Sequence, residues 1–404
     1  MVKSAREGAR PSEAGTLPTE KAWSNLTARR LAGGLLGPLV RRFGRRTGMA
    51  RHSASMSRRS LFRGTAVGAG ALAGAASLVA IDRERPARAR GEDEESRDAE
   101  GFICPIDPGD GFDHTHELAG GVGDVDTDDF DPMRYLESFN YGQVSTLADG
   151  RTLREYSIVA VDKEIEIAPG VFFPAWTYNG TVPGPTIRCT AGDVVRIHFA
   201  NAGSHPHTIH FHGIHPPNMD GVFEVVRVGE SFTYQFEAQP WGLHLYHCHS
   251  VPLKRHIHKG LYGTFIIDPP EGRPLAREMV MLMNGFSTEF NGQNTFYAVN
   301  TVAFHYLKHP IKVKVGERQR VYLTNLTEFD LVNSFHLHAG MFKVFRTGTT
   351  MDSYDLTDTV MLCQGERHVL EFTLPQPGMY MFHAHQSEFA ELGWMGVFEA
   401  VGDA

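Results

Sequence analysis

The sequence predicts an all-β protein built from two similar halves, and two observations carry this prediction. From about residue 151 the chain reads as short runs rich in Val, Ile, Phe, Tyr and Thr, separated by Gly and Pro, which is typical of strands joined by turns. These runs contain an internal repeat, because residues 191–193 (AGD) recur as 315–317 (VGE) and residues 210–212 (HFH) recur as 336–338 (HLH). Each half has the length of a Greek-key β-sandwich.

Two segments at matching places in the repeat show the pattern of a half-buried strand. Apolar and polar residues alternate in 195–199 (VRIHF) and in 321–324 (VYLT). Because successive side chains of a strand point to opposite faces, we expect each of these strands to bury one face.

The composition of the 404 residues is that of a globular protein, with 42% hydrophobic and 21% charged residues. It excludes a wholly disordered chain and a polytopic membrane protein. The charge is unevenly distributed: residues 1–89 carry 17 Lys and Arg against 5 Asp and Glu, whereas the remainder carries 22 against 42. An acidic surface disfavours nucleic acid and anionic lipid as partners.

The first ninety residues have the pattern of an export signal rather than that of a folded domain. Ser57–Arg63 (SRRSLFR) is followed by a Gly/Ala-rich apolar run over 64–81 and by Ala87–Ala89 (ARA), a pattern that resembles a twin-arginine signal peptide over residues 56–89. Residues 1–55 precede Met56 and are interpreted as an upstream extension. We expect a protein exported to the periplasm, the cell surface or the medium, without a stable membrane anchor.

The remaining chain divides into three parts. Residues 90–150 are acidic and rich in loop-forming residues, and predict a linker or arm. The two β domains are then expected over residues 151–270 and 271–404, with the boundary near the turn residues 269–272 (PPEG).

Histidines in H-x-H pairs are the strongest functional signal. In an extended strand such a pair places two imidazoles on one face, roughly 7 Å apart, which suits one metal ion or two adjacent ions. One pair would be weak evidence, but four pairs occupy equivalent places in the two halves: His210/His212, His247/His249, His336/His338 and His383/His385.

A thiol narrows the choice of metal. Cys248 stands between His247 and His249, and His207 and His256 flank it in sequence. Two imidazoles and one thiolate in a trigonal site form the blue-copper arrangement, so the sequence predicts copper.

These residues resemble the two-domain, laccase-like multicopper oxidases, a family related to the copper nitrite reductases. The resemblance rests on H-x-x-H-x-H at His207–His212, on H-C-H at His247–His249, and on residues 179–188 (NGTVPGPTIR). It implies two tandem cupredoxin-like domains and four coppers per subunit. The type 1 copper would be held in the first domain by His207, Cys248 and His256, with Leu261 at the axial position as a residue that cannot coordinate.

The resemblance also assigns a three-copper cluster. It implies type 2 ligands His210 and His336, and type 3 ligands His212, His247, His249, His338, His383 and His385. The second half has Asn333 and Ala384 where the first has His207 and Cys248, so its type 1 ligands are missing while its cluster ligands remain. His205, His215, His244 and His258 have other spacings, and we expect them to surround the copper sites rather than bind metal.

The family's activity is the one-electron oxidation of a donor coupled to four-electron reduction of O₂ to water. The resemblance therefore implies O₂ and a small reducing substrate, a phenol or aromatic amine by default or a metal ion, with Cys248 carrying electrons to the cluster. Asp220 and Glu388 are the proton-donor candidates. The family's assembly implies a homotrimer with clusters at subunit interfaces. The pairing of Cys104, Cys189 and Cys363 is not predictable.

Two alternatives stay open. A copper nitrite reductase shares the spacing of His207 and His212, but that family has aspartate at the place of His210 and no histidine at the place of His249. A non-catalytic copper-binding or electron-transfer protein would use Cys248 in a simple cupredoxin centre with one copper ion. Copper content distinguishes the three functions: an oxidase would hold four copper ions per chain, a nitrite reductase two, and an electron-transfer protein one.

Overall fold

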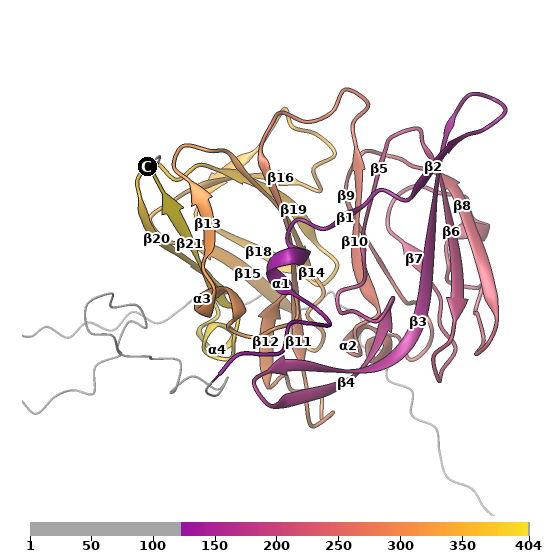
Figure 1. Ribbon diagram of the computed structural model, residues 1–404, viewed down its shortest axis with the longest axis horizontal. Coiled ribbons are helices and arrows are strands. Elements are labelled where there is room, and N and C mark those ends of the chain that lie inside the picture. Colours follow the sequence, from indigo (N-terminus) through magenta and orange to yellow (C-terminus); the bar gives the residue numbers. More distant parts are fainter. Residues whose placement is uncertain (1–122, 403–404) are drawn as a thin grey trace, which may run out of the picture. The chain divides into compact units, whose positions relative to one another are not determined.

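The computed structural model describes residues 123–402, which lie in one compact unit (Figure 1). The predicted extension 1–55, the predicted signal 56–89 and Cys104 lie outside the described residues. No helix in the described part is long and apolar enough to cross a membrane.

The first half is a sandwich of two five-stranded sheets. One sheet has the order β1-β5-β10-β9-β7, and the other has the order β2-β3-β6-β8 with β4 paired to β3. The strands are β1 Phe139–Asn140, β2 Gln143–Thr146, β3 Thr152–Ala168, β4 Val171–Tyr178, β5 Thr186–Thr190, β6 Val194–Asn201, β7 His210–Phe211, β8 Ser231–Glu237, β9 Gly242–His247 and β10 Tyr262–Asp268. Ile197, Phe199 and Tyr234 lie in the core between the sheets.

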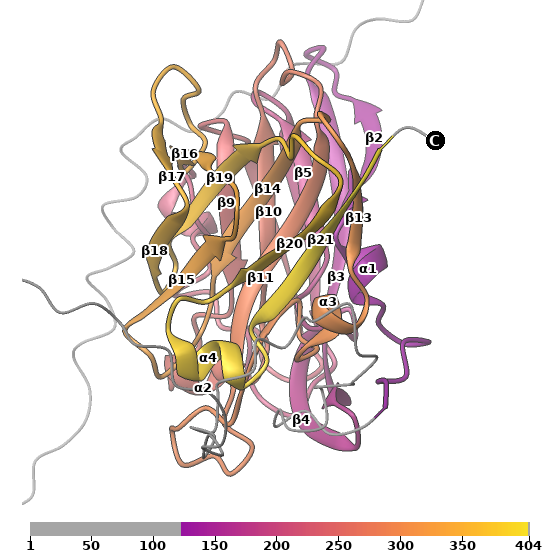
Figure 2. The ribbon, with the colours of Figure 1, turned by 90° about the vertical axis from the view of Figure 1, so that its left-hand side faces the viewer.

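The second half repeats the plan. Its sheets have the orders β12-β11-β14-β19-β16-β17 and β13-β21-β20-β15-β18 (Figure 2). The strands are β11 Arg277–Phe286, β12 Phe296–Val299, β13 Ile311–Lys314, β14 Gln319–Asn325, β15 Val332–Leu337, β16 Phe342–Arg346, β17 Asp355–Thr357, β18 Thr359–Cys363, β19 Arg367–Phe372, β20 Gly378–His383 and β21 Met395–Val401. The expected all-β class with two sandwich halves is confirmed.

Few helices accompany the sheets. They are α1 Pro132–Tyr135, α2 Leu253–His258, α3 His305–Lys308, α4 Ser387–Glu391 and the 3-10 turn η3 Pro217–Met219. Helix α2 connects β9 to β10 and carries His256, so its position decides where that imidazole lies.

The two alternating strands differ in burial. In β6, Val195 and Ile197 are buried while Arg196 and His198 face outward, as expected. In β14 every residue is buried, so the expectation of one exposed face is wrong for this strand. Its second face packs against the first half, where Tyr322 joins Leu243 and Ile266 in one hydrophobic cluster. Contacts between the two halves therefore bury the face of β14 that the alternating sequence pattern predicted to be exposed.

Part of the stretch expected to be a linker belongs to the fold. Strand β1 pairs in parallel with β5, and β2 pairs antiparallel with β3. Asp131 caps α1 by accepting the Met133 amide hydrogen bond at 2.8 Å. Tyr135 and Leu136 are buried, and this burial holds the segment on the sandwiches.

Candidate metal centres

The first candidate centre consists of His207, Cys248 and His256, here called the type 1 set. Cys248 Sγ lies 3.2 Å from His256 Nδ1 and 3.9 Å from His207 Nδ1, and the two Nδ1 atoms are 3.2 Å apart. All three residues are buried. Three elements bring them together: the end of β9, helix α2, and a bridge in which His207 pairs with Val226.

The surroundings of the type 1 set favour a bound metal ion. Burial lowers the pKa of His207 and of His256 to about 4, so both imidazoles are neutral at pH 7, which is the form that binds metal. Burial raises the pKa of the Cys248 thiol, so metal binding there must displace a proton. Leu261 is fully buried, and its carbonyl accepts the Cys248 amide hydrogen bond at 2.9 Å.

The second candidate centre is the group His210, His212, His247 and His249, here called the first quartet. Strands β7 and β9 pair His210 directly with His247. His210 Nδ1 lies 2.8 Å from the Asp220 carbonyl oxygen, and His247 Nδ1 lies 2.9 Å from the Cys248 carbonyl oxygen. A carbonyl only accepts, so each Nδ1 carries the proton and each Nε2 is free to bind metal.

Two further contacts complete the first quartet. His212 Nε2 and His247 Nε2 face each other at 3.2 Å, the approach expected of two atoms aimed at metal. The His249 ring lies 5.4 Å from the His210 ring, centroid to centroid. Burial lowers the pKa of His212 to about 3 and that of His247 to about 4.

The second half repeats this arrangement in His336, His338, His383 and His385, here called the second quartet. Strands β15 and β20 pair His336 with His383. His336 Nδ1 lies 3.0 Å from the Asp358 carbonyl oxygen and His383 Nδ1 lies 2.6 Å from that of Ala384, again leaving Nε2 free. His338 Nε2 and His383 Nε2 are 2.8 Å apart. The His385 ring lies 5.3 Å from that of His336.

The second half has no counterpart of the type 1 set among its described residues. Asn333 is fully buried at the place of His207, donates to Thr327 Oγ1 at 2.9 Å and accepts from the Ser334 amide at 2.7 Å. Ala384 is buried at the place of Cys248. The polar groups of Asn333 are therefore satisfied without metal.

The two predicted proton donors differ in position. Asp220 Oδ1 lies 3.1 Å from His210 Nδ1 and 3.6 Å from His215 Nε2, beside the first quartet. Glu388 is exposed in the first turn of α4, and no hydrogen bond or ion pair in the described residues joins it to either quartet.

Sequence reasoning missed Trp176. Its ring centroid lies 4.4 Å from that of His205, 5.4 Å from His207 and 4.9 Å from His256, so it covers the type 1 set. Trp176 belongs to β4, outside the copper motifs, and no residue spacing in the sequence connects it with His207 or His256.

The four histidines with other spacings make local contacts. His205 Nδ1 lies 2.7 Å from Ser204 Oγ, and His215 and His244 bond backbone carbonyl oxygens. His258 Nε2 accepts the Ser287 amide hydrogen bond from the second half at 2.9 Å.

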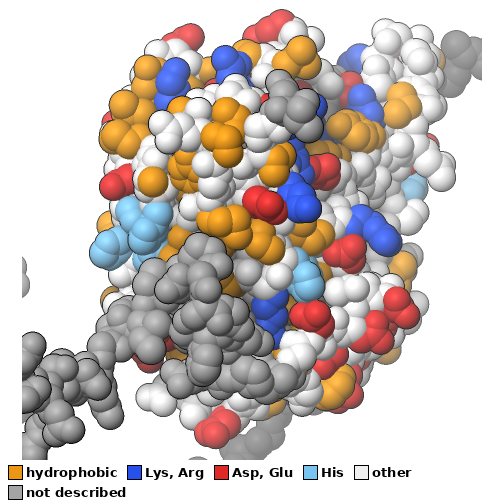
Figure 3. Space-filling view, turned by 60° about the vertical axis from the view of Figure 1, so that its left-hand side comes forward, with side chains coloured by type: hydrophobic (Ala, Val, Ile, Leu, Met, Phe, Trp, Pro, Cys, Tyr) orange, Lys and Arg blue, Asp and Glu red, His pale blue; other side chains and the backbone are white. Residues whose placement is uncertain are grey.

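No hydrogen bond or ring contact within residues 123–402 joins the first quartet to the second. Both quartets have exposed apolar residues near them in sequence: Ile214, Phe223 and Val251 in the first half, and Leu331 and Met341 in the second. Figure 3 shows histidine side chains gathered at the surface beside hydrophobic ones.

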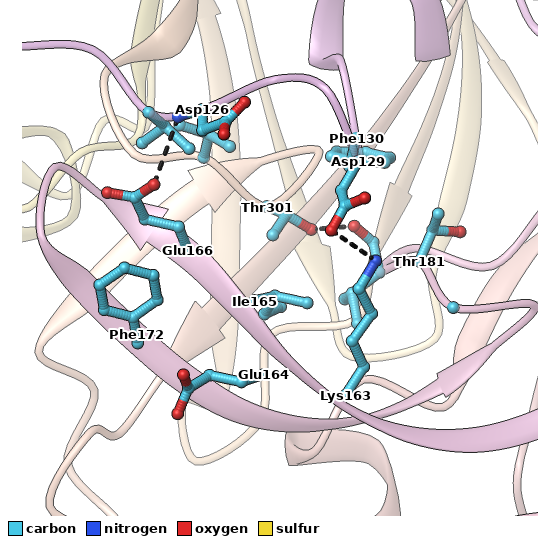
Figure 4. A pocket seen from close by; sticks show the side chains of 14 residues that line it. Asp126, Asp129, Phe130, Lys163, Glu164, Ile165, Glu166, Phe172, Thr181 and Thr301 are labelled. Atoms are coloured by element: carbon cyan, nitrogen blue, oxygen red, sulfur yellow. Dashed lines mark hydrogen bonds and ion pairs between the residues drawn. The ribbon is translucent and has the colours of Figure 1, made fainter.

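A separate cavity of about 160 Å³ lies at the junction of the arm, β3 and the loop carrying Thr301 (Figure 4). Inside it Lys163 Nζ pairs with Asp129 at 3.1 Å, and the Asp126 amide donates to Glu166 at 3.2 Å. Its lining contains no histidine or cysteine, so it is distinct from the metal centres.

Comparison with known proteins assigns these centres to a family. Sequence profiles of multicopper oxidases match residues 161–272 and 274–403. The chain therefore belongs to the multicopper oxidase family, and its two halves are cupredoxin-like domains. Copper is the cofactor of this family, and the His₂Cys set and the two histidine quartets provide a donor set that fits it.

Individual relatives include both oxidases and nitrite reductases. A crystal structure of a multicopper oxidase is 52% identical, with a TM-score of 0.66, over 71% of this chain and 99% of that chain. The blue copper oxidase from Nitrosomonas europaea is 28% identical, with a TM-score of 0.56, over 62% of this chain and 86% of that chain. The copper-containing nitrite reductase of Neisseria gonorrhoeae is 30% identical over 56% of this chain and 62% of that protein, so the chain spans less than two thirds of that curated relative.

Proposed function

We propose that the protein is a laccase-like oxidase, which takes single electrons from a small reducing substrate at the type 1 set and reduces O₂ to water at a three-copper cluster. The observation that carries the proposal is the second quartet. A nitrite reductase or an electron carrier has no use for four further imidazoles, of which His336 and His383 leave Nε2 free as His210 and His247 do.

Copper would supply the electron-accepting centre and the site of O₂ reduction, with four ions per chain: one type 1, one type 2 held by His210 and His336, and a type 3 pair held by the other six histidines of the quartets. Cys248 connects the two kinds of site. Its side chain belongs to the type 1 set, while its backbone continues directly into His247 and His249. This gives electrons a short covalent route.

Reduction of O₂ consumes protons, and Asp220 is the favoured donor. Its carboxylate is partly exposed and lies 3.1 Å from His210 Nδ1, beside the first quartet. Glu388 is the weaker candidate because it is exposed on α4 and forms no hydrogen bond or ion pair with either quartet in the described chain.

The cluster would form between subunits. The quartets make no contact within the described chain, so each needs a partner surface, and a head-to-tail contact that closes produces a ring. A homotrimer follows from the family resemblance. The exposed apolar residues near both quartets supply area for such a contact. Export by the twin-arginine route remains the proposed localisation.

Copper nitrite reduction is the second candidate, favoured by the curated relatives. The residues argue against it, because His210 occupies the place of that family's aspartate and His249 follows the cysteine. Both lie within the first quartet.

Copper counting and substrate turnover test the proposal together. We expect about four copper ions per chain, an EPR-silent coupled pair, and O₂ uptake with a phenol at four electrons per O₂. Two coppers with nitrite-dependent turnover would favour the reductase, and one copper without turnover would favour a carrier.

A further inference from the structure

Cationic side chains lie on helix α2 and directly after it, close to the type 1 set. Helix α2, which carries His256, also carries Lys254 and Arg255, both exposed, and is followed by the buried Lys259. The Arg255 guanidinium lies 5.1 Å from the centroid of the Trp176 ring, and Lys259 Nζ lies 5.7 Å from it. Because Trp176 packs on His256, these cations lie close to the type 1 set.

The exposed cations beside the type 1 set have no carboxylate partner. Lys254, Arg255 and Lys259 form no ion pair with any carboxylate of the described residues. The charges of the exposed Lys254 and Arg255 are therefore available to a ligand, whereas the buried Lys259 donates to the Pro174 carbonyl oxygen.

The nearby carboxylate of Asp162, opposite Trp176 in the β3–β4 pair, already has hydrogen-bond donors. Asp162 accepts hydrogen bonds from the Ser204 amide, at 3.2 Å, and from the Ser204 hydroxyl. In a protein whose residues 90–404 carry 22 Lys and Arg against 42 Asp and Glu, unpaired cations at one site run against the overall charge. This local field attracts anions and repels cations.

We propose that Arg255 selects anionic electron donors, aromatic compounds that bear a carboxylate or sulfonate, and disfavours cationic donors such as ferrous or cuprous ions. This inference rests on the proposed oxidase function. The planar guanidinium suits a carboxylate through two parallel hydrogen bonds. Copper held by the type 1 set would accept the one electron that each donor molecule loses, and the donor's phenolic proton would pass to solvent.

Two matched donors test the inference in the copper-loaded protein. Syringic acid and 2,6-dimethoxyphenol share the phenol and both methoxy groups, and only the former carries a carboxylate. We expect Arg255→Gln to lower kcat/KM for syringate about fivefold, the effect of an exposed charge pair, and to change kcat/KM for dimethoxyphenol less than about twofold. Arg255→Glu should lower the syringate value further. In the wild type, added salt should weaken the preference for syringate.

Arg134→Gln is the matched control, because Arg134 is an exposed arginine on another short helix, α1. It should leave both donors unchanged. Equal changes for both donors in Arg255→Gln, or no change for syringate, would overturn the proposed selection. A wild-type protein without a blue absorption band or O₂ uptake would instead contradict the oxidase function, so the two failures are distinguishable.

Discussion

Cys248 Sγ lies 3.2 Å from His256 Nδ1, although Cys248 follows strand β9 and His256 lies eight residues later on helix α2. The contact exists because β9 delivers the cysteine and α2 folds back across it. We predict that Cys248→Ser removes the blue absorption band and all donor oxidation, since a hydroxyl does not replace a thiolate in a blue-copper site. Visible spectra of copper-loaded protein check this. Cys363→Ser, at an exposed free cysteine, is the control and should keep both properties.

Leu261→Met should lower the reduction potential of the type 1 copper. The buried leucine offers no donor atom, whereas a thioether at the axial position is a weak ligand that favours Cu(II). Redox titration of the blue band measures the shift. Leu243→Met, a buried leucine on β9 that packs between the halves, should leave the potential unchanged. An unchanged potential in Leu261→Met would place Leu261 away from the copper.

Two inactive variants should restore each other if the cluster forms between chains. His210→Ala damages the first quartet and His336→Ala damages the second. When both chains are co-expressed in equal amounts, about one quarter of the head-to-tail contacts in a ring pair an intact first quartet with an intact second. We expect about that fraction of wild-type O₂ uptake. Activity no higher than that of either variant alone would contradict a cluster shared between subunits.

Glu278→Gln should destabilise the contact between the halves. Glu278 accepts hydrogen bonds from Arg188 and Arg320, at 2.6 and 3.0 Å, and from the Tyr322 hydroxyl. Removing the carboxylate leaves two largely buried guanidinium groups short of a partner, which costs on the order of 3 kcal/mol of unfolding free energy. Denaturant unfolding of the metal-free protein measures it. Asp149→Asn, which breaks an exposed pair with Arg151, should cause no measurable change.

Acid should destabilise the protein partly through His305. Burial lowers the pKa of His305 to about 4, below the value near 6.5 of an unfolded histidine. The stability that neutral His305 contributes is complete above pH 6.5 and is lost as pH falls toward 4, by up to about 3 kcal/mol. Unfolding free energies measured at pH 7 and pH 4.5 should therefore differ less in His305→Asn than in the wild type. His198→Asn, at an exposed histidine, should behave like the wild type.

The sequence predicted the parts of the site that depend on local geometry. Each H-x-H pair needs only an extended strand to place both imidazoles on one face, and β7, β9, β15 and β20 supply or border those strands. Trp176 was missed because its contact with His256 depends on β4 and α2 meeting across the chain. The full burial of β14 was missed for a similar reason. The alternating pattern of one strand cannot indicate that another part of the chain covers its polar face.

The arm illustrates the same limit. Strands β1 and β2 are short, and their pairing with β5 and β3 is formed by partners distant in sequence. Acidic residues nearby gave the segment the composition of a linker, while Tyr135 and Leu136 supply the burial that fixes it.

Asn333 affects how strongly the stability of each half depends on copper. The buried amide makes its own hydrogen bonds, so the mononuclear pocket of the second half is complete as soon as the polypeptide folds. The corresponding pocket of the first half holds a buried thiol and two buried imidazoles in close contact. Scarcity of copper would therefore weaken one half of the molecule more than the other.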